Sequence, residues 1–272
     1  GPVTSRSLHR EEGSIVLTRP LAPFGLEVTA PAPGSPLDSV PVPQLRSWVA
    51  DRRLAVLRGF APPSDEAMLA FCKQLGEVLE WEFGAVNELQ VRADARNYLY
   101  TDREVPFHWD GAFVGRVPHY IFFHCQAAPP PGSGGETTFC DTVRLLERAT
   151  PEQRQRWGRI AVTYSTEKVV HYGGSFTAPL LGQHPVTGQT VVRFAEPVED
   201  LNPVRLTISG LPAEEQPRFL AEMHDLLNDP AVCYAHAWRE GDVVLADNHA
   251  LLHGRRAFTG SAARHLRRVN VL

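Results

Sequence analysis

From residue 85 onward the sequence breaks into short apolar segments separated by Gly, Pro and Asp turns, and this pattern constrains the fold most strongly. Short runs rich in β-branched and aromatic residues and bounded by such turns predict strands. The strand candidates are ELQVRA, NYLYT, YIFFHCQ, IAVTYST, TVVRFAE and DVVLADN, and the helix candidates are VRLLERA and EEQPRFLAEMHDLLND. Many short strands joined by long connections are typical of a sandwich, a jelly roll or a barrel.

The first part of the chain predicts a helix, a strand and a second helix. Residues 20–43 are rich in Pro and Gly and form an irregular lead-in. Residues 43–53 have helical spacing of apolar side chains, and residues 54–60 form a short apolar run typical of a buried strand. Ser64 is a suitable N-cap for the second helix, whose apolar stripe consists of Met68, Phe71, Cys72 and Leu75.

The sequence shows neither a repeat of fixed period nor an interdomain linker. We therefore expect one domain over residues 1–272, mostly β with flanking helices. The stretch from about 167 to 197 contains GGSF, HPVTG and further breakers, and it predicts a long irregular loop. Because such loops within compact domains are usually functional, we expect a lid-like insertion over a site.

Composition and charge exclude several classes of protein. Apolar residues make up 43% and charged residues 21% of the 272 residues, as in an ordinary globular domain. The sequence contains neither a membrane-length apolar run nor a charged-then-apolar leader. A net charge of -4 disfavours nucleic acid as a partner. We expect a cytoplasmic protein that acts on a small molecule and binds neither membrane nor nucleic acid, and a homo-oligomer stays open.

The cysteines favour a reducing compartment. They are scattered and include no C-x-x-C pair, so we expect buried thiols rather than disulfides at Cys72, Cys125, Cys140 and Cys233.

His108 and Asp110, in the segment PFHWDGAF, are the first candidate metal ligands. With 11 histidines and 31 acidic residues in 272, about one H-x-D/E pair is expected by chance, and His9-x-Glu11 is a second example. In an extended chain, side chains two residues apart point to the same side, so both groups of the HWD triplet could reach one metal ion. The alternative interpretation is a buried core histidine followed by a turn aspartate.

The segment GDVVLADNHALLHGRRAFTGSAARHLRR adds the third candidate ligand, His253, after a predicted strand and turn. Two imidazoles and one carboxylate form the facial triad typical of non-haem Fe(II) oxygenases, which leaves three metal positions open. Arg264 could hold a co-substrate carboxylate through its planar guanidinium. Strand alternation places Arg264, Leu266 and Arg268 on one side. A solvated basic edge is expected for the remaining arginines of this segment, Arg255, Arg256 and Arg267.

Four separated segments together resemble the TauD/TfdA family of Fe(II)/2-oxoglutarate-dependent dioxygenases. They are HWD at 108–110, GGETTF at 134–139, HPVTG at 184–188, and GDVVLADNHALLHGR at 241–255 followed by Arg264. The segments stand in the family's order with about its spacing. The resemblance implies a double-stranded β-helix core of the jelly-roll or cupin-like kind. Two positions depart from the common pattern, since Ala246 stands where many members carry Trp and Glu136 follows the paired glycines.

The resemblance also implies roles for individual residues. His108, Asp110 and His253 would bind Fe(II). Arg264 and Thr137 would bind the distal carboxylate of the co-substrate 2-oxoglutarate, and Arg268 would lie near the co-substrate or an anionic substrate. The reaction would use O2 and form succinate, with the oxidative chemistry supplied by metal and co-substrate. Halogenating relatives lack a carboxylate at the position of Asp110, so its presence favours hydroxylation, desaturation or another oxidation.

The segments HWDGAF, YIFFHCQAAPP and GGETTFC are also similar to members of the family from isonitrile natural-product pathways, the PvcB-like branch. This similarity implies a secondary-metabolic substrate such as tyrosine isonitrile, oxidised by desaturation or oxidative decarboxylation, with Arg268 as a partner of its carboxylate. Aromatic residues surround the metal motif, and core packing is the first interpretation of them. The second is an aromatic-lined substrate pocket formed by Tyr98, Tyr100, Phe107, Trp109 and Phe113.

Other functions stay open on the sequence alone. A catabolic dioxygenase for taurine or an aryloxy acid would differ from the isonitrile oxygenase only in its substrate. A non-catalytic metal-binding protein would use the same β-helix fold for binding alone. His249 and His253 are four residues apart, as zinc ligands on a helix are. The sequence lacks H-E-x-x-H, and Asp247-Asn248 predicts a turn, which weakens a zinc hydrolase. His119 and His124 are expected to be ordinary strand histidines.

Overall fold

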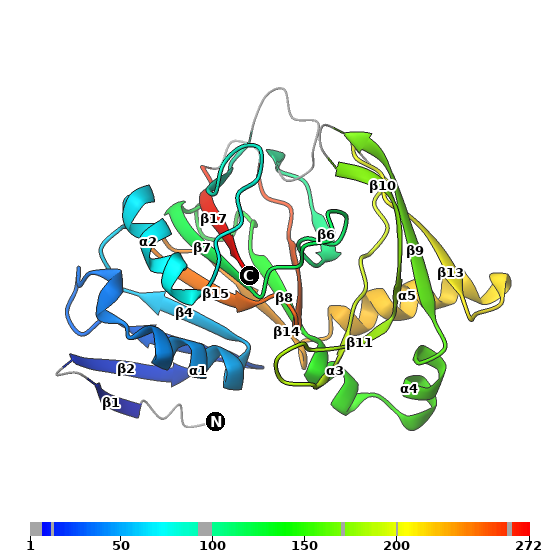
Figure 1. The fold of residues 1–272 in the computed structure, drawn as a ribbon, viewed down its shortest axis with the longest axis horizontal. Helices are drawn as coiled ribbons and strands as arrows, with labels where there is room; N and C mark the ends of the chain where they lie inside the picture. The colour runs from blue at the N-terminus through cyan, green and yellow to red at the C-terminus, as the bar shows by residue number, and fades with distance from the viewer. Residues whose placement is uncertain (1–6, 12–13, 92–99, 170–171, 200, 260–262) are drawn as a thin grey trace.

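Two β-sheets pack face to face at the centre of the structure (Figure 1). The computed structural model describes residues 7–11, 14–91, 100–169, 172–199, 201–259 and 263–272. Within these residues the larger sheet has the strand order β1 (Ser7–Glu11), β2 (Ser14–Pro20), β3 (Leu26–Thr29), β4 (Leu54–Arg58), β15 (Val243–Asp247), β7 (Tyr120–Ala127), β17 (His265–Val271) and β5 (Asn87–Leu89). The smaller sheet has the order β14 (Cys233–His236), β8 (Thr137–Asp141), β16 (Leu251–Arg255) and β6 (Val105–His108). The predicted mostly β fold with a double-stranded β-helix core is confirmed.

Apolar side chains from both sheets fill the space between them. On β7, Ile121 and Phe123 point toward the smaller sheet, and Phe123 packs against Phe139 of β8 with ring centroids 6.1 Å apart. Tyr120 and Phe122 of the same strand belong to the core on the opposite face of the larger sheet. Because side chains alternate across a strand, β7 supplies two cores at once, which explains its almost continuous apolar sequence.

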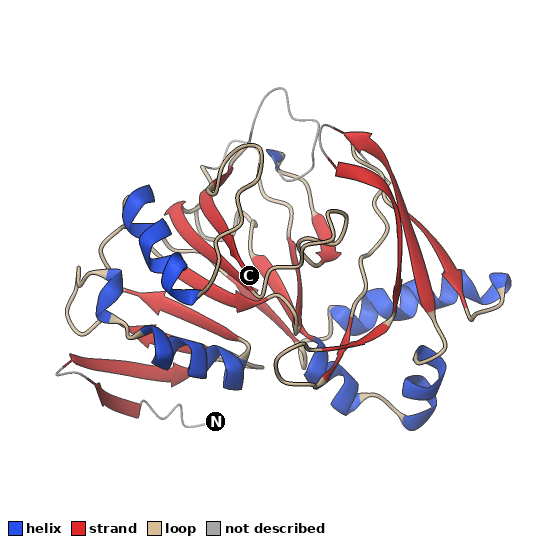
Figure 2. Ribbon diagram, viewed as in Figure 1, coloured by secondary structure: helices blue, strands red, loops and turns tan. Residues whose placement is uncertain are grey.

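Two helices cover the outer face of the larger sheet (Figure 2). They are α1 (Val42–Arg52) and α2 (Asp65–Leu75), with a short 3-10 helix, Leu37–Ser39, before α1. The Ser64 hydroxyl accepts a hydrogen bond from the Ala67 amide at 3.1 Å, so the predicted N-cap of α2 is confirmed. Among the described residues, every helix is too short or too polar to cross a membrane.

The residues between β8 and β14 form a second lobe with its own hydrophobic core. It contains a three-stranded sheet of order β10 (Tyr172–Pro179), β9 (Ala161–Val169) and β13 (Arg205–Ser209), and the hairpin of β11 (Leu181–Gln183) and β12 (Thr190–Val192). Its helices are α3 (Thr142–Arg148), α4 (Pro151–Trp157), the 3-10 helix Ala213–Glu215 and α5 (Gln216–Leu227). Trp157, Tyr164, Phe194 and Met223 are fully buried in this lobe.

The prediction of an irregular loop from about residue 167 to 197 is wrong, because most of this stretch forms strands. The glycines and prolines that suggest a loop stand at turns and strand ends: HPVTG lies between β11 and β12, and Pro179 ends β10. Sequence breakers mark the ends of short hairpins as readily as they mark loops. The strand candidate NYLYT is also not confirmed, since Tyr100 lies outside any strand and residues 97–99 lie outside the described residues.

Candidate metal centre and co-substrate pocket

Strand pairing brings together the two histidines predicted as metal ligands. In the antiparallel pairing of β16 with β6, His253 is the direct partner of His108. Directly opposed side chains in such a pair lie close together, and the two imidazole centroids are 4.3 Å apart. Asp110 follows the end of β6, and its Oδ1 lies 3.6 Å from His108 Nε2 and 3.2 Å from His253 Nε2. The three predicted ligand groups therefore form one cluster.

The free nitrogen atoms of this cluster suit a metal ion. His108 Nδ1 lies 2.9 Å from the carbonyl oxygen of Pro106. A carbonyl only accepts, so Nδ1 carries the proton and Nε2 keeps its lone pair. His253 Nε2 is buried and lacks a hydrogen-bond partner among the described residues. Neighbouring ligand atoms about 2.1 Å from an octahedral metal lie roughly 3 Å apart, which is close to the observed separations.

Electrostatics set the protonation states that a metal needs. Burial opposes ionisation of Asp110, but the positive charge of Arg268 and the contacts with His253 and His108 outweigh it and hold the pKa of Asp110 well below its ordinary value. Burial, reinforced by His108, lowers the pKa of His253 to about 4. At neutral pH the cluster thus offers neutral His253 and a carboxylate, the ligand forms that bind metals.

Two asparagines hold Asp110 in place, and neither was assigned a role from the sequence. Asn248 Oδ1 accepts from the Asp110 amide at 3.0 Å, while Asn248 Nδ2 donates to the Asp110 carbonyl at 3.1 Å. Asn270 Nδ2 donates to Asp110 Oδ2 at 3.0 Å. The signal for Asn270 was present, since the alternation through Leu266 and Arg268 extends to residue 270.

Arg264 and Thr137 form a second polar group across from the metal cluster. Arg264 Nε donates to the Gly135 carbonyl at 3.0 Å, and Arg264 Nη2 donates to Thr137 Oγ1 at 3.3 Å. The Trp238 indole also donates to Thr137 Oγ1, at 2.8 Å. Both lone pairs of this hydroxyl are then occupied, so its own proton is free to be donated to a ligand. Burial, followed by the charge of Arg255, lowers the pKa of Arg264 to about 9, so the guanidinium stays charged at neutral pH.

The paired glycines of GGETTF allow this geometry. A Cβ on Gly134 would lie 2.1 Å from the Ala257 carbonyl oxygen, and a Cβ on Gly135 would lie 3.2 Å from Cδ and Nε of Arg264. Both residues have positive φ, which favours glycine. The motif therefore lets the backbone of one segment lie against the Ala257 carbonyl and against the side chain of Arg264.

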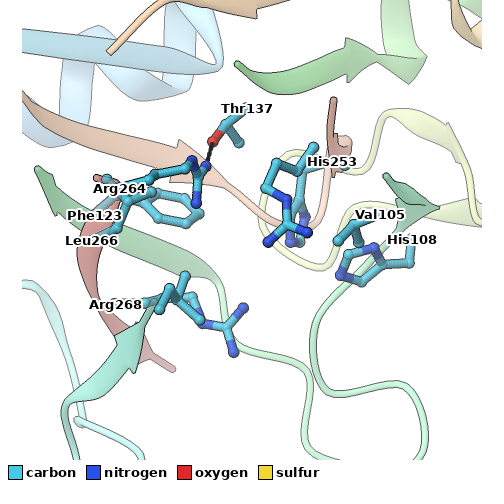
Figure 3. Close-up of a pocket in the computed structure, with 11 residues that line it drawn as sticks. Val105, His108, Phe123, Thr137, His253, Arg264, Leu266 and Arg268 are labelled. Carbon is cyan, nitrogen blue, oxygen red and sulfur yellow. Dashed lines mark hydrogen bonds between the residues drawn. The ribbon is translucent and has the colours of Figure 1, made fainter. Parts of the chain in front are cut away.

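One pocket connects the two polar groups (Figure 3). Figure 3 shows Arg264 and Arg268 on one side and His108 and His253 on the other. Apolar side chains fill the spaces between these groups, and they belong to Leu89, Val105, Phe123 and Leu266. Arg268 Nη1 lies 3.6 Å from Asp110 Oδ2, and its buried Nε has no hydrogen-bond partner within the described part of the chain. The pocket can therefore hold an anionic molecule beside a metal ion.

The predicted alternation along the last strand is confirmed. Arg264, Leu266 and Arg268 line the pocket, whereas Arg267 points to the outer face and binds Asp65 of α2 at 2.7 Å. The pairing irregularity near His265 adds its extra residue to β7, so the alternation of β17 itself is unbroken.

The predicted solvated basic edge holds for Arg256, which is exposed, but it is wrong for two other arginines. Arg255 is 7% and Arg267 5% exposed. Arg255 lies in the middle of the smaller sheet and stacks over Phe258 at 5.3 Å. Arg267 is covered by the start of α2 and also contacts His124. A charge pattern alone could not reveal that helix and sheet neighbours cover both groups.

The aromatic residues around the HWD triplet have different environments. Phe107 and Trp109 alternate with the ligand groups and are buried in the second-lobe core, as the core-packing interpretation expects. Tyr100 donates to Asn87 Oδ1 at 3.1 Å, and Phe113 packs edge-on against Phe176 of β10 with centroids 4.7 Å apart. These four side chains are not among the residues that line the described pocket. Tyr98 lies outside the described residues.

A second histidine cluster surrounds Asp247. The zinc hydrolase hypothesis requires His249 and His253 to bind one ion, but the two residues belong to different clusters. His249 lies with its ring centroid 5.2 Å from His119 and 5.3 Å from His184, while His253 belongs to the cluster with His108. His184 Nδ1 accepts the amide of Val186 at 3.1 Å, so its Nε2 carries a proton and donates to Asp247 Oδ2 at 2.8 Å. This hydrogen bond ties the HPVTG turn to the end of β15, and we interpret it as structural.

Comparison with known proteins agrees with the geometry. The model of the family described as "Taurine catabolism dioxygenase TauD, TfdA family" matches residues 17–270. The 3-((Z)-2-isocyanoethenyl)-1H-indole synthase of Fischerella ambigua is 45% identical over 266 residues, which cover 96% of this chain and 97% of that protein. The tyrosine isonitrile desaturase of Pseudomonas aeruginosa is 37% identical over 254 residues, which cover 91% of this chain and 87% of that protein.

A solved structure of a similar oxygenase supports the same family assignment. A structure of PvcB, described as an Fe, alpha-ketoglutarate dependent oxygenase from an isonitrile synthetic pathway, is 34% identical and has a TM-score of 0.78, covering 98% of this chain and 91% of that one. The family match spans nearly all of the chain, and the fold and the residue cluster agree with it. The chain therefore belongs to the TauD/TfdA family of dioxygenases.

Proposed function

We propose that this chain oxidises an aromatic amino-acid-derived isonitrile that carries a carboxylate, in secondary metabolism. As a family member it is an Fe(II)- and 2-oxoglutarate-dependent oxygenase that uses O2. One observation carries the proposal: His253 Nε2, buried beside Asp110 and without a hydrogen-bond partner among the described residues, belongs to the same pocket as the Arg264 guanidinium. Such a site needs both a metal and an anion. The assignment of an isonitrile as the substrate class rests on two relatives, one named for an isocyanoethenyl-indole product and the other for tyrosine isonitrile.

In this proposal His108, Asp110 and His253 bind the iron, and Arg264 with Thr137 binds the distal carboxylate of 2-oxoglutarate. Bound iron and 2-oxoglutarate together supply the oxidising chemistry, with succinate and carbon dioxide as co-products. The chain's own residues bind, orient and exclude water. The Arg264 guanidinium neutralises the carboxylate while the Thr137 hydroxyl donates its free proton to it. Phe123 and Leu266 keep this part of the pocket dry.

Arg268 is the proposed partner of the substrate carboxylate. Its guanidinium lines the pocket 3.6 Å from Asp110 Oδ2, and its buried Nε has no hydrogen-bond partner among the described residues. Arg264 already has the Gly135 and Thr137 oxygens beside it and suits the co-substrate, whereas Arg268 lies beside the metal cluster, where the substrate must react. The carboxylate of Asp110 occupies the position that halogenating relatives leave free, so hydroxylation, desaturation or oxidative decarboxylation is the expected outcome.

We also propose that residues 1–272 act as one domain in which the stretch from about 167 to 197, which includes β10, forms a lid-like insertion. Phe176 of β10 packs against Trp109 and Phe113, which flank Asp110 in the sequence. The Glu196 amide donates to the Phe107 carbonyl at 2.9 Å, so the insertion contacts the segment that carries two of the proposed iron ligands. Phe113 and Phe176 are then candidates to contact an aryl group. Protection of this stretch from proteolysis on adding 2-oxoglutarate and substrate would support the lid.

A small-molecule substrate without nucleic acid or membrane partners, and a cytoplasmic location, belong to the same proposal. Cys72, Cys125 and Cys140 are buried free thiols, which suits a reducing compartment. The elution volume of the purified protein would test a homo-oligomer.

Succinate release coupled to substrate oxidation tests the function. Enzyme, Fe(II), 2-oxoglutarate and O2 are supplied with tyrosine isonitrile, tryptophan isonitrile, taurine or 2,4-dichlorophenoxyacetate, and product mass is recorded. Stoichiometric succinate with an isonitrile alone supports the proposal, and a product two mass units lighter identifies desaturation. Turnover of taurine or the aryloxy acid instead would favour the catabolic alternative. Iron binding without succinate across all four compounds would favour a non-catalytic protein.

A further inference from the structure

The two carboxylate oxygens of Asp110 have different surroundings. Oδ1 faces the two imidazoles, at 3.2 Å from His253 Nε2 and 3.6 Å from His108 Nε2. Oδ2 accepts a hydrogen bond from Asn270 Nδ2 at 3.0 Å and lies 3.6 Å from Arg268 Nη1. One oxygen is therefore presented to the metal cluster, and the other is occupied by donors from β17.

The orientation of the Asn270 amide follows from its second partner. Trp81 Nε1 lies 3.2 Å from Asn270 Oδ1. An indole N–H can only donate, so the atom facing it must be the amide oxygen, and the amide nitrogen must then face Asp110. The two contacts agree on one orientation of the side chain, in which Trp81 donates to Asn270 and Asn270 donates to Asp110.

The backbone of Asn270 is also fixed. Asn270 is 2% exposed, it pairs with Ile121 of β7, and its carbonyl accepts from the Leu79 amide at 2.9 Å. A residue held from both sides on an inner strand has little backbone freedom. The hydrogen bond to Asp110 thus comes from a rigid support, which is what a positioning group requires.

We propose that Asn270 is a positioning residue for the metal centre: it engages Asp110 Oδ2 so that only Oδ1 is presented between the two histidines, and Trp81 holds its amide in the donating orientation. This inference rests on the proposed iron site. An Asp110 carboxylate released by Asn270 could rotate or turn both oxygens toward the metal, which would occupy a position that the co-substrate or O2 needs. Hydrogen-bond partners of metal ligands typically affect metal affinity by about tenfold to a hundredfold.

The test compares Asn270→Leu, which keeps the branched shape of the side chain and removes the donor, with Asn202→Leu. Asn202 is equally buried at 2% exposure, its side chain accepts from the Thr166 hydroxyl at 3.0 Å, and it belongs neither to the metal cluster nor to the residues that line the described pocket. The dissociation constant for Co(II) is measured on metal-free protein by its absorption spectrum. Asn270→Leu is expected to weaken Co(II) binding by about tenfold to a hundredfold. Asn202→Leu is expected to lower the melting temperature without changing this constant.

Two further measurements exclude a merely structural role. The charge-transfer band of anaerobic Fe(II) and 2-oxoglutarate should shift in Asn270→Leu, since the field of the Asp110 ligand changes. Trp81→Phe retains Asn270 and should shift Co(II) affinity in the same direction by less, with no additional effect when combined with Asn270→Leu. Parental Co(II) affinity and an unshifted band in Asn270→Leu, or parental affinity in Trp81→Phe if Asn270→Leu does not fold, would overturn the inference. A parent enzyme that binds neither metal nor 2-oxoglutarate would instead refute the proposed function.

Discussion

The side chain of Arg264 passes directly over Gly135, so that a Cβ at Gly135 would lie 3.2 Å from Cδ and Nε of Arg264. The same arginine donates to the Gly135 carbonyl at 3.0 Å. The glycine therefore leaves room for the proposed co-substrate anchor and also accepts a hydrogen bond from it. This relationship makes the anchor sensitive to one methyl group.

Gly135→Ala is expected to weaken 2-oxoglutarate binding, because the added methyl group displaces Arg264. Gly132→Ala is the matched control, since Gly132 has φ +82° against +83° for Gly135, but no atom of the described residues lies within 4 Å of its added Cβ. Both changes should cost about 1 to 2 kcal/mol of stability from the left-handed backbone. Calorimetric titration with 2-oxoglutarate should separate them, and equal affinity in both variants would contradict the proposed anchor.

Arg264→Lys is expected to raise the KM for the co-substrate by about tenfold to a hundredfold. Lysine keeps the positive charge but cannot reproduce the planar fork that donates to Gly135, Thr137 and a carboxylate, and a charged hydrogen bond contributes about 1.5 to 3 kcal/mol. Arg256→Lys, at an exposed arginine nearby, should leave this KM unchanged. Steady-state succinate assays at varied 2-oxoglutarate provide the measurement, and parental KM in Arg264→Lys would remove Arg264 from the co-substrate site.

Arg268→Met is expected to raise the KM for the isonitrile substrate by more than tenfold while the KM for the co-substrate changes much less. Methionine retains the apolar stem and removes the guanidinium that would face the substrate carboxylate. An isonitrile methyl ester should be affected less than the acid by this change. If instead the KM for the co-substrate rose most, Arg268 would serve 2-oxoglutarate rather than the isonitrile.

The stability of the metal-free protein is expected to fall as the pH is lowered from about 6.5 to 4. Burial lowers the pKa values of His124, His249 and His253 to about 4, below the value of about 6.5 in an unfolded chain. The unfolded state then binds protons first, so acid favours unfolding in this window. Urea unfolding at pH 7, 6 and 5 measures this pH dependence of the free energy of unfolding. His249→Asn should flatten the dependence, and a free energy of unfolding that is constant over this range would contradict the assignment.

Strand alternation predicted part of the site well because it is a local property. The row of Arg264, Leu266 and Arg268 needed only the strand period, and it stayed correct because the pairing irregularity adds its residue to β7. The same rule would have reached Asn270. The pairing of His108 with His253 could not be derived from the sequence, since β6 has four residues and its register against β16 depends on tertiary contacts. The ligand chemistry of a facial triad and the family resemblance, rather than the strand pattern, predicted that these two side chains meet.

Burial of charge was the least predictable property. Arg255 and Arg267 stand in a basic segment that suggests a solvated edge, yet both are buried beneath neighbours that are distant in the sequence. The breakers between 167 and 197 were misleading for a related reason, because a turn within a hairpin and a turn within a loop use the same residues.

The central claim is that one pocket binds Fe(II) through His108, Asp110 and His253 and 2-oxoglutarate through Arg264. Anaerobic addition of Fe(II) and 2-oxoglutarate to the metal-free protein, followed by visible absorption, tests it most directly. The account predicts a coloured charge-transfer band that requires both additions, disappears in His253→Ala, and needs more 2-oxoglutarate in Arg264→Lys. A colourless parent protein under these conditions, or an unchanged band in His253→Ala, would contradict it.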